Sequence, residues 1–168
     1  MTAGPIRHRL SMAVFYETDQ LWSTVVDLLG SGLGIDQQGC AGRGEVLAGI
    51  APPQHLPWEL SARLFALVRC IEPYGAAPAS KVIYATSGGV LSTLTRVCPA
   101  RGCTNLVNGA LSDVSAARDG ACLALRHHLD AGAILLVVAA NTPSQQAVSS
   151  QALLRKSRHG VQTFEFTH

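Results

Sequence analysis

The run AILLVVA at 133–139 decides the fold that this sequence predicts. It shows no polar alternation, which is typical of a strand in the middle of a sheet. A helix signal follows at 142–157. Its first residues, TPSQ, supply an N-cap, a proline suited to the first helical position and a glutamine that can reach back to the N–H of the cap. The run VQTFEFT at 161–167 then predicts a second strand, so this end of the chain is a strand–helix–strand unit.

The N-terminal end repeats the same order of elements. MAVFY at 12–16 predicts a strand, the amphipathic stretch at 19–32 a helix, and the run at 35–41 a second strand. Two such units in one antiparallel sheet give a ferredoxin-like α+β fold with both helices on one face. Phe164 and Phe166 alternate with more polar residues, so we expect the other face of the sheet to be free for a partner.

One domain is expected to span the whole chain, 1–168, because this length suffices for a single core. The first unit lies at 11–41 and the second at 131–168, and a largely helical insertion at 42–130 separates them. Within the insertion the sequence predicts helices at 58–71 and at about 112–130, and a short strand at 81–86. Trp22 and Trp58 each adjoin an apolar helical face, which indicates core or interface positions.

Only 14% of the residues are charged and the net charge is +2. Because basic residues do not cluster, nucleic acid is not an expected partner. A surface so poor in charge favours a homo-oligomer. The start of the chain lacks the apolar core of a signal peptide and no stretch is long enough to span a bilayer, so a cytoplasmic location is expected. Contact with a membrane surface is left open.

The best candidate for a binding site is the stretch Thr86-Ser87-Gly88-Gly89, between a predicted strand and a predicted helix. Backbone N–H groups at such a turn can bind an anion, and a serine there can act as a nucleophile. A tight turn with an N-cap explains the same residues without any ligand. His128, near the apolar stripe of its helix, joins these four residues as a candidate, whereas His127 is expected to face solvent.

No metal site or cofactor is predicted. The five cysteines are Cys40, Cys70, Cys98, Cys103 and Cys122, and their spacing matches neither zinc ligands nor a redox pair. They are interpreted as reduced, buried thiols. No catalytic residue is identified, and no pair of carboxylates has the pattern of a known site.

The segments 13–39 and 125–166, with the motif GAILLVV at 132–138, resemble the flanking halves of bacterial heat-induced general-stress proteins. The resemblance implies that the two ends fold together and carries no catalytic residues. Many members of that family have a Gly/Ala-rich apolar middle, which suggests membrane association, and the insertion here departs from that pattern.

The sequence therefore favours a non-enzymatic binding, regulatory or stress-related domain that acts as a homo-oligomer. The alternative is a small enzyme or a protein that binds a metabolite or small anion at the Thr86–Gly89 turn.

Overall fold

The computed structural model describes residues 7–68, 71–76, 83–87 and 127–167. It has the α+β class that the sequence predicts, with one antiparallel sheet and several helices.

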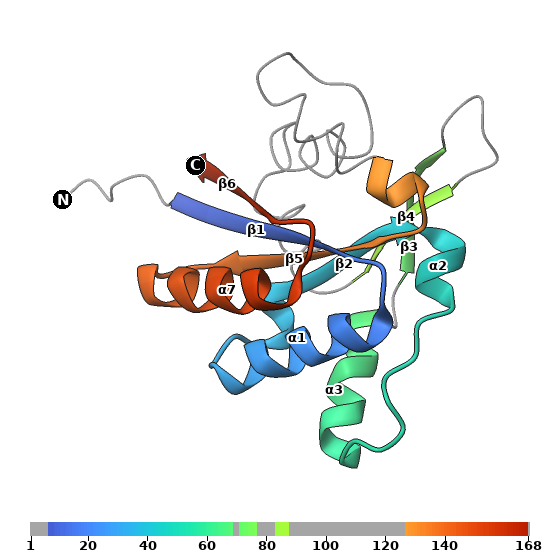
Figure 1. The fold of residues 1–168 in the computed structure, drawn as a ribbon, viewed down its shortest axis with the longest axis horizontal. Coiled ribbons are helices and arrows are strands. Elements are labelled where there is room, and N and C mark those ends of the chain that lie inside the picture. The colour runs from blue at the N-terminus through green and yellow to red at the C-terminus, as the bar shows by residue number, and fades with distance from the viewer. Residues whose placement is uncertain (1–6, 69–70, 77–82, 88–126, 168) are drawn as a thin grey trace.

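The sheet contains six strands in the order β3-β4-β2-β5-β1-β6, and every neighbouring pair is antiparallel (Figure 1). The strands are β1 (Arg7–Phe15), β2 (Gln38–Arg43), β3 (Ile71–Ala76), β4 (Ile83–Ser87), β5 (Ile134–Ala140) and β6 (Val161–Thr167). The described helices are α1 (Thr18–Gly30), the 3-10 helix η1 (Ile35–Gln37), α2 (Gly44–Ala48), α3 (Trp58–Val68) and α7 (Pro143–Lys156), and residues 127–130 are also helical.

β5 lies between β1 and β2, so the prediction that this apolar run forms a central strand is confirmed. Phe15 of β1 pairs with Ile134 of β5, and Ala13 pairs with Val161 of β6. The end of β1, the start of β5 and the start of β6 therefore lie at the same end of the sheet. This end carries the side chains described in the next section.

Helices α1 and α7 pack against each other and lie on one face of the sheet (Figure 1). Side chains from both helices and from alternate strand residues form the main core. Its largest members include Phe15, Trp22, Leu28, Leu64 and Leu136. The indole N–H of Trp22 donates to the carbonyl of Ala51 at 2.9 Å, which satisfies the one polar atom of this buried ring.

The second face of the sheet is buried at the central strands β1 and β5, so the prediction that this face is free for a partner is wrong there. Met12 pairs with Val137 and Val14 with Leu135, and the exposed fraction of each of these four side chains is 4% or less. Burial of the second face is favourable at these strands, because these four side chains are apolar and leave no polar group without water. The side chains of Phe164 and Phe166, on which that prediction depended, lie outside the described residues.

The insertion contributes β3 and β4, which extend the sheet beyond β2. β4 agrees with the short strand predicted at 81–86, whereas β3 was not predicted. The helix expected at 58–71 ends at Val68, and Ile71 begins β3. Pro73, two residues beyond the predicted end of that helix, lies at an irregular position of the β3–β4 pair. An apolar side chain such as Ile71 fits a strand as well as a helix, so the pattern alone did not separate the two.

Thr142 caps α7 as predicted, and its hydroxyl accepts the N–H of Gln145 at 3.2 Å. The Gln145 side chain also reaches back, but its oxygen accepts the N–H of Asn141 at 3.0 Å rather than that of Thr142. The same oxygen accepts the amide of Gln37 at 3.2 Å, and that amide also donates to the carbonyl of Ala139 at 3.1 Å. Gln37 thus connects η1 to the end of β5 and the start of α7.

Candidate functional site

Three aromatic side chains from distant parts of the chain meet at the end of the sheet where β1 stops. They are Tyr16, directly after β1, His128, in the helical turn before β5, and His159, in the turn between α7 and β6. We call them the three-ring cluster. The strand pairing explains the meeting, because the segments next to Phe15, Ile134 and Val161 must emerge together.

A glycine in the left-handed region fixes the position of His128. Gly132 has φ +90°, and its N–H donates to the carbonyl of Leu129 at 3.0 Å. The N–H of Ala133 donates to the carbonyl of His128 at 2.9 Å. This pair of hydrogen bonds is the Schellman motif, which ends the helix and turns the chain directly into β5. The helix ends at Asp130, in agreement with the end predicted at about residue 130.

Ser157 and Gly160 hold His159 at the opposite side of the cluster. Gly160 has φ +79° and permits the tight turn into β6. The hydroxyl of Ser157 lies 3.2 Å from the carbonyl of Val14, and it accepts the N–H of His159 at 3.4 Å. The turn is therefore tied to the end of β1, next to Tyr16.

The hydroxyl of Tyr16 and Nδ1 of His128 lie 2.6 Å apart and share a hydrogen bond, whose donor depends on the tautomer of the imidazole. The His128 and His159 ring centroids are 4.8 Å apart, and Tyr16 lies edge-on to both rings at 5.7 Å and 5.1 Å. His128 is half-buried and His159 is exposed. The cluster is therefore open to solvent at Tyr16 and His159, while the His128 ring is partly buried.

Burial lowers the pKa of His128 below its ordinary value of 6.5, and the nearby His159 and then His127 lower it further by charge repulsion. His128 is therefore mainly neutral at neutral pH, when it can accept a proton. If all three imidazoles were protonated, they would repel one another in this small region. A bound anion would relieve that repulsion.

Of the predicted site residues, only His128 lies in this cluster. Its half-buried position and the exposed position of His127 are as predicted. Thr86 and Ser87 are the last two residues of β4, where their backbones pair with Ala41 and Cys40 of β2. They also pair with β3, so this part of the expected turn is strand. Gly88 and Gly89 lie outside the described residues. The His128 ring contacts Tyr16 and His159.

The sequence reading missed Tyr16 and His159. One signal could have found them: both residues flank predicted strands at ends that an antiparallel arrangement brings together. A histidine at position 159 also suits the dipole of the preceding helix, which favours a positive charge there but does not require an imidazole.

Cys40 has no place in this chemistry. It is buried in β2, and burial raises the pKa of its thiol to about 12. This agrees with the predicted buried thiol, and the other four cysteines lie outside the described residues. Within the described part of the chain, no group of three His, Cys, Asp or Glu side chains could hold a metal ion. None of the helices described there is both long and apolar enough to span a bilayer.

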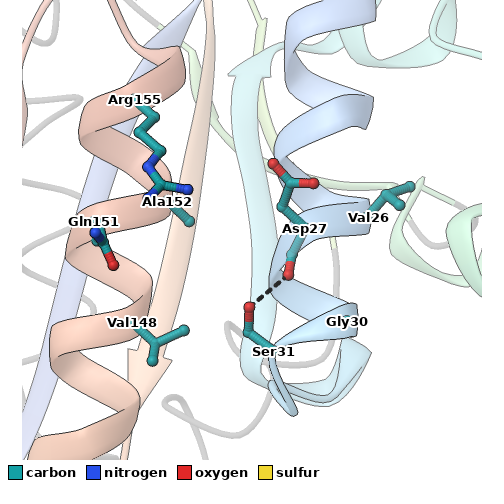
Figure 2. Close-up of a pocket in the computed structure, with 8 residues that line it drawn as sticks. All are labelled: Val26, Asp27, Gly30, Ser31, Val148, Gln151, Ala152 and Arg155. Carbon is teal, nitrogen blue, oxygen red and sulfur yellow. Dashed lines mark hydrogen bonds between the residues drawn. The ribbon is translucent and has the colours of Figure 1, made fainter.

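A groove that is open to solvent lies between α1 and α7, with a volume of about 550 Å³ (Figure 2). Val148 and Ala152 of α7 face Gly30, the last residue of α1, and Ser31, which follows it. The Ser31 hydroxyl donates to the backbone carbonyl of Asp27 at 2.8 Å. The lining of the groove also includes the polar side chains of Asp27, Ser31, Gln151 and Arg155. The groove is open to solvent, whereas the three rings of the cluster contact one another, so the three-ring cluster is the better candidate.

No family model, curated protein or solved structure matched the chain in the three comparisons.

Proposed function

We propose that the protein is a non-enzymatic binding domain that holds a small anion, such as phosphate or a carboxylate, at His128 and His159. The carrying observation is the meeting of Tyr16, His128 and His159 from three separate segments. The imidazoles of His128 and His159, with ring centroids 4.8 Å apart, can donate to one anion together. The hydrogen bond between the Tyr16 hydroxyl and Nδ1 holds the His128 ring in a fixed orientation. Protonation of these rings and anion binding support each other, so binding strengthens as the pH falls.

The scaffold of this domain is proposed to be ferredoxin-like, formed by the two ends of the chain. The strand order β6-β1-β5-β2 and the placement of α1 and α7 on one face support that assignment. A regulatory or stress-related role, as in the heat-induced general-stress proteins that the two ends resemble, is part of the same proposal.

The test follows the histidine ring signals by NMR while inorganic phosphate or acetate is added to the protein at about pH 6. We expect the His128 and His159 signals to shift together and to saturate. The shifts should disappear in His128→Asn and His159→Asn. His55, an exposed histidine in the loop before α3, supplies the matched control, and His55→Asn should bind as the wild type does. Equal, unsaturable shifts at His55 and His128 would contradict the proposal.

A second candidate is a small enzyme in which His128 is a general base. The 2.6 Å contact with Tyr16 and the lowered pKa of His128 favour it, because both suit an imidazole that accepts a proton at neutral pH. Turnover of simple phosphate or carboxylate esters that is lost in His128→Asn and retained in His55→Asn would favour the enzyme. The alternative anion site is the stretch Thr86–Gly89, whose first two residues end β4.

A further inference from the structure

Helix α3 is apolar on two opposite sides. Its inner side contributes Leu64, Leu67 and Val68 to the buried core. On its outer side, Trp58 is 78% exposed and Phe65 is 52% exposed. A surface helix ordinarily turns charged or polar residues to solvent, and a helix that is apolar all round is usually covered on every side.

The outer residues form one continuous stripe. Successive residues of an α-helix are about 100° apart, so Trp58, Ala62 and Phe65 fall on the same side. Ala66 extends this side and is exposed. We call these four residues the α3 stripe. Leu64 and Leu67 lie on the opposite side, in agreement with their burial.

The stripe gathers exposed apolar area that is scattered elsewhere. The large apolar side chains exposed in the described ranges are Tyr16, Trp58, Phe65 and Leu154. Tyr16 belongs to the three-ring cluster and Leu154 stands alone on α7, whereas Trp58 and Phe65 lie two turns apart on one helix. Isolated exposed apolar residues are common, but a contiguous apolar patch marks a contact surface.

Two opposite charges lie along a single edge of this stripe. Glu59 and Arg63 are both exposed, one turn apart, and the helical geometry places them on the same flank. When two such helices pack face to face and antiparallel about a two-fold axis, the same flank of each helix lies on the same side of the interface. Glu59 then lies across from Arg63 of the partner subunit, and the contact occurs twice.

We propose that the α3 stripe binds a second copy of this chain as an antiparallel helix pair. Trp58 packs towards the Phe65 end of the partner helix, and the small side chains of Ala62 and Ala66 let the two helices approach closely. The two copies form Glu59–Arg63 pairs along one edge. The partner surface is thus the outer side of α3 rather than the buried sheet.

One helix pair is smaller than the interface of a permanent dimer, so the self-association is weak and depends on concentration. Neither the three-ring cluster nor its anion takes part, because none of Tyr16, His128 and His159 belongs to the α3 stripe. Failure of anion binding would therefore leave this inference intact, and the reverse also holds.

The first test measures the oligomeric state of the full chain by sedimentation velocity over a hundredfold range of concentration. We expect a reversible monomer–dimer equilibrium. Trp58→Gln with Phe65→Gln should weaken dimerisation more than tenfold while the circular dichroism spectrum is retained. Leu154→Gln, which changes an exposed leucine of α7, is the matched control and should dimerise like the wild type. A wild-type chain that stays monomeric throughout would overturn the proposal.

The second test uses charge reversal and identifies the geometry. Glu59→Arg alone places two arginines against two arginines, and Arg63→Glu alone places two glutamates against two glutamates, so each variant should dimerise several-fold more weakly than the wild type. A mixture of the two variants restores both opposite-charge contacts, so it should form a heterodimer. A mixture that stays monomeric while the wild type dimerises would reject the antiparallel pair, and a wild-type dimer unaffected by the Trp58 and Phe65 changes would place the interface elsewhere.

Discussion

Trp22 and Trp58 both lie in amphipathic helices, yet their environments are opposite. Trp22 in α1 is 2% exposed and its N–H is satisfied by Ala51, whereas Trp58 in α3 is 78% exposed. Trp22 lies in line with Val25, three residues on, and therefore points to the core. Trp58 lies across the helix from Leu67. The comparison shows that an adjacent apolar stripe does not bury an aromatic residue unless the two share an angle around the helix.

The two helices consequently do different work. α1 turns exposed polar residues such as Asp19 and Asp27 to solvent, and it is typical of a helix with a single apolar face. α3 packs one apolar face against the core and exposes the other at the surface. Substitutions in α1 should therefore change the stability of the fold, and those on the outer side of α3 should change association.

The largest expected effect is the contrast between the two tryptophans. Trp22→Ala removes a fully buried ring and should lower the free energy of unfolding by about 3–5 kcal/mol. Trp58→Ala should change it by about 0.5 kcal/mol or less, because the ring contacts mainly water in a single copy. Chemical denaturation of dilute protein measures both. Similar losses for the two variants would contradict the assignment of one ring to the core and the other to the surface.

The contrast also shows how far the sequence could lead. It predicted the α+β class and the central position of β5, because a run without polar residues has few other places in a sheet. It read Trp22 and Trp58 alike, since it counted the apolar neighbours of each residue without comparing their angles around the helix. Trp22 lies in the core, and Trp58 lies at the surface.

The site was less predictable than the fold. His128 was identified because it is a histidine beside an apolar stripe, but its partners come from segments far along the chain. Tyr16 is 112 positions from His128, and only the strand register brings the two together. A register cannot be read from residue types when both strands are apolar on both faces, because a shift of one residue changes little in the pattern.

The end of α1 offers a second, smaller contrast, between two glycines. Gly32 has φ +88°, and its N–H and that of Leu33 bond back to Leu29 and Leu28. Gly32→Ala should cost about 1–2 kcal/mol because an L residue is strained at that φ. Gly30 is helical and a Cβ there would meet no atom within 4 Å, so Gly30→Ala should raise stability by about 0.5–1 kcal/mol. Thermal unfolding of the two variants should shift in opposite directions, and a shared direction would contradict the motif.

Helix α7 allows the same reasoning at its N-terminus. Thr142→Ala removes the hydroxyl that accepts the N–H of Gln145 and should lower the free energy of unfolding by about 1 kcal/mol. Thr142→Ser retains the oxygen and should remain near the wild type. Denaturant titration of the pair isolates the cap, because the change of volume at this exposed position is small. A loss of equal size in both variants would assign the effect to the methyl group of Thr142 instead.

The smallest expected effect is the response to pH, and it separates the three-ring cluster from α3, which contains no histidine. The pKa of His128 is lower in the folded chain than its ordinary 6.5, owing first to burial and then to His159 and His127. The unfolded chain therefore binds a proton at a higher pH than the folded chain does. This contribution to stability is complete above pH 6.5 and decreases as the pH falls towards the folded pKa.

His128→Asn should flatten the dependence of the free energy of unfolding on pH between about pH 5 and pH 7, measured in buffer free of phosphate and carboxylates. His55→Asn should leave the wild-type slope unchanged, because His55 lies in an exposed loop away from the cluster. The Trp58→Ala variant should also keep that slope while it weakens association. If Trp58→Ala altered the slope and His128→Asn did not, His128 would not be the group whose titration changes stability. The pH dependence would then arise from association of the chains rather than from the fold of one chain.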